Sequence, residues 1–282
     1  MMRREDSGWA ASILAVLAIG LALCLGPARA ASLDYQSALA AFERGDFELA
    51  EKALNELAAE GDARAQSLLG QMYARGEVVP RDYLRALRWL QEAARQGHAE
   101  AQYNLGLMYE QGLGVDPDMS EAVRWYRSSA HNEYSKALNN LAVLYHVGRG
   151  VPRDYARALG LYRRAAAQGN SLAQNNLGIM YANGQGVAKD YAEAASWYRK
   201  AAEQGHADAQ FNLGVMYGNG HHVSRDFVQA YAWWSLAAAQ GNRKALRYRG
   251  IVQQRMSREE MARAVELARS LRDTYGSAWL RE

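Results

Sequence analysis

Cysteine is almost absent from this 282-residue sequence. The single one, Cys24, lies inside an apolar run that extends from Ala10 to Gly26. Leu23 precedes it, where a lipoprotein cleavage site requires a small residue, so lipidation of Cys24 is not expected. Without this segment the chain contains no cysteine, which excludes disulfides, thiol catalysis and cysteine-based zinc sites.

The apolar run is also shorter than the roughly 20 residues that a membrane-spanning helix needs. It follows a head that contains Arg3 and Arg4, and it precedes Ala28 and Ala30, which fit a small-x-small cleavage pattern. These features predict a signal peptide over residues 1–30, cleaved after Ala30, and a mature protein in the periplasm with no membrane segment. An uncleaved N-terminal anchor is the alternative.

A strong excess of charge of either sign is missing as well. Beyond residue 30 the chain carries 30 basic and 28 acidic residues. Residues 243–282 hold ten of the basic and five of the acidic ones, but they do not form the concentrated basic stripe of a nucleic-acid-binding protein. The sequence therefore predicts no nucleic-acid partner.

The usual catalytic motifs are also absent. We find no G-x-S-x-G elbow, no H-E-x-x-H and no complete phosphate-loop signature. Asp116 and Asp118 resemble the start of a calcium loop, but Glu121 stands where that loop requires glycine. His221 and His222 are too few for zinc, which takes three or four protein ligands. We therefore predict no catalytic residue, no metal site and no cofactor.

The sequence does contain a repeat with a period of 36 residues. Leucine recurs at this spacing at Leu69, Leu105, Leu141, Leu177 and Leu213. The same spacing gives a small residue at the next position, then a tyrosine, a glycine and an aspartate. Tryptophan closes four of the five copies, at Trp89, Trp125, Trp197 and Trp233. A fixed period of this length is typical of a solenoid, in which each unit buries its apolar face only against its neighbours.

Each unit is predicted to be a pair of antiparallel helices. Apolar residues from position 65 to 73 recur at helical spacing and predict the first helix, which ends at Gly76. A second helix is predicted from Asp82, as N-cap, to Gln96, with Gly97 in the left-handed conformation. Trp89 and its equivalents are expected in the core, where the small residue at 70 lets the helices approach.

Two further features of the unit follow from the same alignment. Asp118 with Glu121, and Asp190 with Glu193, resemble capping boxes at the start of the second helix. The run "NGQGV" at residues 183–187 suggests a phosphate-binding loop when it is read alone. It recurs in degenerate form in every unit and leads into an aspartate that would repel a phosphate, so it is interpreted as the connection between two helices.

The run "AQNNLGIMYANGQGVAKDYAEAASWYRKAAEQG", residues 173–205, and its four neighbours resemble Sel-one-like repeats, relatives of the tetratricopeptide repeat. The five units are residues 63–98, 99–134, 135–170, 171–206 and 207–242. Residues 31–62 resemble a shorter tetratricopeptide-type pair that caps the N-terminal end. Residues 243–282 are interpreted as a degenerate C-terminal helical cap, a terminal helix pair that closes the solenoid, with Ser257 and Glu260 as a capping box.

This resemblance implies an all-α, right-handed α-solenoid that acts as a scaffold for protein partners. Some secreted relatives are held by disulfide pairs and are linked to β-lactam binding or hydrolysis, but this chain lacks the cysteines. We predict an exported scaffold, not an enzyme, that binds a protein or an extended peptide. An envelope enzyme or binder acting on peptidoglycan or β-lactams, and a purely structural or oligomerising protein, are the alternatives.

The binding surface is predicted from the columns that differ between units, because columns that repeat are explained by stacking. In tetratricopeptide relatives the face of the first helix opposite its core stripe lines the concave groove. On that face the columns at 64, 67, 71 and 74 differ between units, and the columns at 67 and 74 supply the predicted site. The predicted partner-binding residues are Tyr103, Glu110, Asn139, His146, Asn175 and Phe211.

Overall fold

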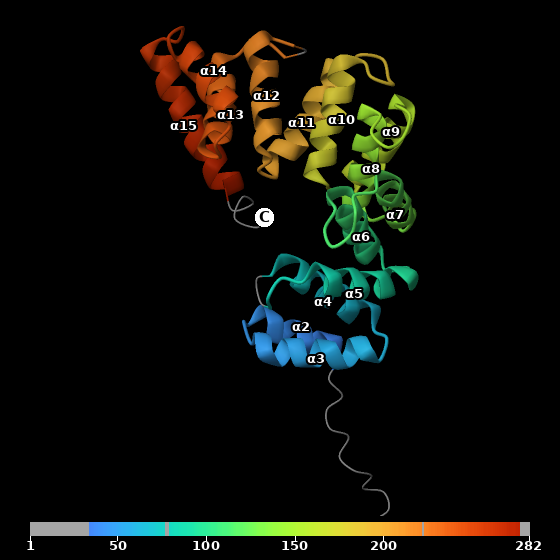
Figure 1. The fold of residues 1–282 in the computed structure, drawn as a ribbon. Coiled ribbons are helices and arrows are strands. Elements are labelled where there is room, and N and C mark those ends of the chain that lie inside the picture. The colour runs from blue at the N-terminus through green and yellow to red at the C-terminus, as the bar shows by residue number, and fades with distance from the viewer. Residues whose placement is uncertain (1–33, 77–78, 222, 277–282) are drawn as a thin grey trace, which may run out of the picture.

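The computed structural model describes residues 34–76, 79–221 and 223–276, which form fourteen α-helices and no strand. The helices form antiparallel pairs that stack side by side into an open, curved solenoid (Figure 1). No helix among these residues is long and apolar enough to cross a membrane. The predicted signal peptide, residues 1–30, lies outside the described residues.

The repeat period fixes the helix boundaries. The first helices of the five units are α4 (Ala63–Arg75), α6 (Ala99–Gln111), α8 (Ser135–Val147), α10 (Ser171–Asn183) and α12 (Ala207–Asn219). The second helices are α5 (Tyr83–Arg95), α7 (Met119–His131), α9 (Tyr155–Ala167), α11 (Tyr191–Glu203) and α13 (Phe227–Ala239). Ahead of them stands the pair α2 (Tyr35–Glu43) and α3 (Phe47–Ala59), and after them follow α14 (Arg243–Gln253) and α15 (Arg258–Tyr275).

Helix ends are set by the predicted capping residues. The Asp82 carboxylate accepts a hydrogen bond from the Arg85 backbone N–H at 3.0 Å, and Gly76 ends α4 with φ of 69°, a conformation that favours glycine. The capping box expected at Asp118 is only half formed. Asp118 accepts from the Glu121 backbone N–H, but the Glu121 carboxylate pairs with Arg124 at 2.6 Å instead of returning to the N-cap.

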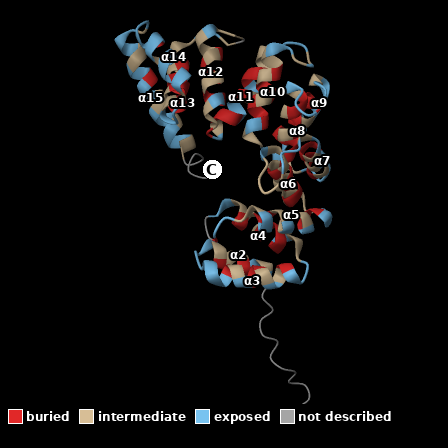
Figure 2. Ribbon diagram, viewed as in Figure 1, coloured by how far each residue is buried: buried red, intermediate tan, exposed pale blue. Residues whose placement is uncertain are grey.

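The core lies between the two helices of each pair and between neighbouring pairs (Figure 2). The predicted leucine column is buried throughout. The side chains opposite it on the second helices are one position beyond the tryptophan column, at Leu90, Tyr126, Tyr162, Tyr198 and Trp234, and all are buried. A Cβ at Gly70 would lie 2.6 Å from Leu90 Cγ, so the small residue allows a close approach.

The expectation that the tryptophan column fills the core is wrong for three of its four members. Trp89, Trp125 and Trp197 are only half-buried. Because an α-helix turns about 100° per residue, the residue after each tryptophan faces the first helix and the indole lies beside the core. Arg124 covers the ring of Trp125, with Cζ 4.3 Å from the ring centroid.

Trp233 is the exception, because the last helix covers it. Tyr275 of α15 stacks on Trp233 with ring centroids 6.4 Å apart, and Trp233 is buried. α15 packs along α13 and does not pair with α14. Two helices thus follow the repeats at the C-terminal end, but both pack mainly on α13 and not on each other. α14 takes the place of a first helix, but it carries Arg249 where the other first helices carry the core leucine.

Candidate partner-binding groove

Three hollows follow one another along the first helices and together form what we call the first-helix groove. They enclose about 360, 420 and 800 Å³. Lys136, in the first turn of α8, lines all three. Tyr103 of α6 is shared by the first two, and Leu172 of α10 by the second and third. The hollows thus adjoin one another at shared residues and follow consecutive repeats.

Two of the predicted residues, Tyr103 and Asn139, line this groove. The ring of Tyr103 is half-buried and packs against Tyr134, with ring centroids 5.4 Å apart. Burial raises the pKa of the Tyr103 phenol, so the side chain stays a neutral hydrogen-bonding group at physiological pH. An aromatic ring with a polar tip is a frequent anchor in protein interfaces.

The two asparagines of the predicted set are buried and join consecutive repeats. Asn139 and Asn175 are each 5% exposed. The Asn139 carbonyl oxygen accepts a hydrogen bond from Asn176 at 3.2 Å, and that of Asn175 accepts one from Asn212 at 3.0 Å. At Asn139 and Asn175 the column at 67 therefore stabilises the stack of repeats.

The other predicted residues lie outside the groove hollows. Glu110 accepts a hydrogen bond from the Tyr126 hydroxyl at 2.6 Å and pairs with Arg149 at 3.0 Å. The ring of His146 packs edge-on against Tyr155, and burial lowers the pKa of its imidazole. Phe211 packs edge-on against Tyr248. The structure therefore does not bring the six residues together into one site.

Three of the residues that line the groove were not predicted from the sequence. Lys136, Asn140 and Leu172 line the groove, and Lys136 and Leu172 are exposed. Lys136 and Leu172 lie in the first turns of α8 and α10 and belong to the column at 64, which reads Arg64, Glu100, Lys136, Leu172 and Asp208. This column changes charge and polarity in every unit, as a recognition surface would.

The histidines have local structural roles. The Nδ1 atoms of His98 and His206 accept hydrogen bonds from backbone N–H groups in the first turns of α6 and α12, so both act as N-caps. His221 stacks on Tyr191 with ring centroids 4.5 Å apart, while His222 lies outside the described residues. Within residues 34–76, 79–221 and 223–276 no three histidine, cysteine or acidic side chains gather as metal ligands would.

The fold and the groove define the class of protein, a helical-repeat solenoid that presents an extended surface. The family model of the Sel1 repeat matches residues 63–98, 99–134, 135–170, 171–206 and 207–242. The chain therefore belongs to the Sel1 repeat family. Proteins with these repeats are typically scaffolds for protein–protein interactions and are generally not enzymes.

Two solved structures illustrate the similarity. The chain is 34% identical to c5321, a protective antigen of uropathogenic Escherichia coli with the SLR fold, at a TM-score of 0.78. This match covers 83% of the present chain and 50% of c5321, so the chain spans about half the length of that protein. It is 31% identical to a Sel1 repeat protein from Oxalobacter formigenes, with a TM-score of 0.73 and coverage of 84% and 99%. No curated protein matches the sequence significantly.

Proposed function

We propose that this protein is an exported scaffold that binds a protein segment or an extended peptide in the first-helix groove. The observation that carries the proposal is the row of hollows that meet at Lys136. A ligand that follows this row would contact several repeats, and a preformed surface loses little conformational entropy on binding. The lining of Tyr103, Lys136, Asn140 and Leu172 offers an aromatic ring, a cation, an amide and an apolar contact.

Selection of peptides from a random display library on the purified protein tests the groove. The selected peptides are then measured for binding to Lys136→Glu and Tyr103→Ala, with Leu84→Ala as the matched control. Leu84 is an exposed apolar side chain on α5 that lines none of the hollows described above. We expect each groove substitution to weaken binding by about tenfold or more, as at interface hot spots, and the control to leave it unchanged.

Because Tyr103 is half-buried, its replacement could act through folding. Lys136 is exposed, so Lys136→Glu separates loss of binding from loss of structure. If peptides bind Lys136→Glu and Tyr103→Ala as tightly as the unmodified protein, the groove is not the binding surface.

Export to the periplasm is the second part of the proposal, and it rests on the sequence of residues 1–30. Sequencing the N-terminus of the protein recovered from the envelope fraction tests it. We expect a chain that begins at Ala31. Recovery of a chain that begins at Met1 would contradict cleavage.

A further inference from the structure

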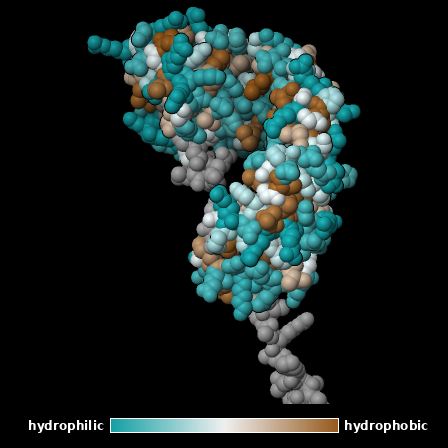
Figure 3. All heavy atoms as spheres, in the orientation of Figure 1, coloured by the Kyte–Doolittle hydropathy of each residue, from teal (hydrophilic) through white to brown (hydrophobic). Residues whose placement is uncertain are grey.

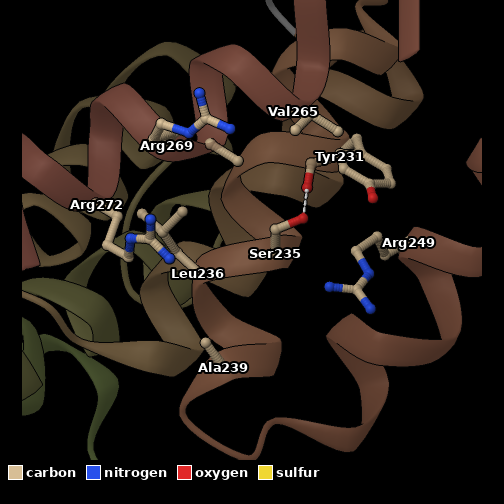
Figure 4. A pocket seen from close by; sticks show the side chains of 9 residues that line it. Tyr231, Ser235, Leu236, Ala239, Arg249, Val265, Arg269 and Arg272 are labelled. Atoms are coloured by element: carbon tan, nitrogen blue, oxygen red, sulfur yellow. Dashed lines mark hydrogen bonds between the residues drawn. The ribbon is translucent and has the colours of Figure 1, made fainter. Parts of the chain in front are cut away.

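A separate hollow lies at the C-terminal end of the solenoid, between α13, α14 and α15 (Figure 4). It encloses about 350 Å³. The hollow exists because α15 packs along α13 and leaves a space beside α14. None of its lining residues lines the first-helix groove.

On the face visible in Figure 3 the surface is largely hydrophilic, with apolar residues in separate patches.

The lining of this hollow is positively charged. It includes Arg249, Arg269 and Arg272 and no aspartate or glutamate. Arg269 pairs with Glu266 at 3.3 Å, and Arg272 lies 3.9 Å from Asp273, but these pairs are exposed. Exposed pairs contribute little because water screens them. No ion pair recorded among the described residues involves Arg249.

Arg249 is the least expected of the three. It occupies the column of the buried core leucine, which is Leu213 in the preceding repeat. Its side chain is half-buried, with Cζ 5.8 Å from the ring centroid of Tyr231. No carboxylate among the described residues pairs with this guanidinium, so an anion bound in the hollow would supply its ion-pair partner.

The arrangement of the side chains suits an anion with two or more oxygens. In Figure 4 Arg249 stands on one side of the hollow and Arg269 and Arg272 on the other, with Ser235 between them. The Ser235 hydroxyl donates to the Tyr231 backbone oxygen at 2.8 Å. Guanidinium groups bind carboxylates and phosphates through pairs of parallel hydrogen bonds. We propose that this hollow is a binding site for a carboxylate or phosphate group.

Isothermal titration calorimetry at low ionic strength tests the site with two probes, inorganic phosphate and acetylated tetraglutamate. We expect saturable binding of at least one probe, weakened by added salt. Phosphate binding alone would identify a free or covalently attached phosphate as the ligand, and tetraglutamate binding alone would identify an acidic protein segment. Failure of both probes to bind would overturn the proposal.

Substitutions assign the binding to the hollow. Because each substitution removes charge-assisted hydrogen bonds to the anion, we expect Arg249→Gln and Arg272→Gln each to weaken binding by about tenfold or more. Arg263→Gln removes an exposed arginine of α15 that does not line the hollow and is expected to have no effect. An equal loss with Arg263→Gln would show a non-specific charge effect and refute the site.

Arg249→Leu guards against misfolding as an explanation, because leucine occupies this column in all five repeats. This variant should retain the thermal stability of the unmodified protein and still lose affinity. Arg249→Lys keeps the positive charge but loses the planar guanidinium group, so this variant should bind the anion less tightly than the unmodified protein does. Unchanged affinity in Arg249→Leu would refute the assignment.

Discussion

A valine at Gly106 would test the close approach of the two helices within a repeat. A Cβ at this position would lie 2.7 Å from Cδ1 and Cε1 of Tyr126. That ring cannot move aside easily, because it is fully buried and its hydroxyl donates to Glu110 at 2.6 Å. Valine would therefore force α6 and α7 apart or displace the ring.

The magnitude follows from two opposed effects. Overpacking a well-packed core costs about 1–3 kcal/mol, while valine is a better helix former than glycine by a few tenths of a kcal/mol. We expect Gly106→Val to lower the free energy of unfolding by about 1–3 kcal/mol. For a chain of this size each kcal/mol corresponds to roughly 2–4 °C in Tm. Alanine would be a weaker test, because the third repeat already carries Ala142 in this column.

Thermal unfolding followed by circular dichroism measures the effect, and Gly160→Val in α9 is the matched control. A Cβ at Gly160 would meet no heavy atom within 4 Å. The control carries the same change in helix propensity without the clash, so its Tm should stay the same or rise slightly. An equal fall in Tm for both variants would refute the reasoning, because it would reflect the β-branched side chain alone.

Three further predictions concern the stack and its caps. Leu90→Ala should cost about 2–5 kcal/mol in unfolding experiments, and more than Trp89→Ala if the tryptophan column lies beside the core. Asn139→Ala should cost about 1–3 kcal/mol, because Asn176 loses its acceptor; Lys136→Ala serves as the exposed control. Burial lowers the pKa of His98 from its ordinary 6.5, so its contribution to stability is complete above pH 6.5 and is lost as the pH falls through the lowered pKa. His98→Asn, which keeps a capping side chain that cannot titrate, should flatten the dependence of Tm on pH in this range; an unchanged profile would contradict the assignment.

Positions in this protein differ in how far the sequence predicted their structure. Helix starts such as Asp82 and helix ends such as Gly76 were predicted correctly, because capping depends on residues close in the chain. The burial of Asn139 was not predicted. A column that varies between repeats is as compatible with packing against the next repeat as with a ligand, and the contact to Asn176 spans 37 positions in the chain.

The groove was likewise predicted only in part from the sequence. Variation in the columns at 64 and 67 indicated that this helix face differs between repeats, and Tyr103 does line the groove. The continuity of the hollows depends on how far each repeat is rotated and displaced against the next. That geometry results from many packing contacts, such as Gly70 against Leu90, and it cannot be derived from one column of the aligned repeats. Glu110 and His146 were therefore placed on the right helices but outside the hollows.

The sequence by itself determined the repeat, the helix pairs, their caps and the family, because each of these depends on local chemistry that recurs every 36 residues. Only the tertiary structure decided how α14 and α15, which follow the last repeat, pack. α15 packs along α13, where its Tyr275 covers Trp233, and this contact joins residues 42 positions apart in the chain. The basic hollow at the C-terminal end exists because α15 packs along α13.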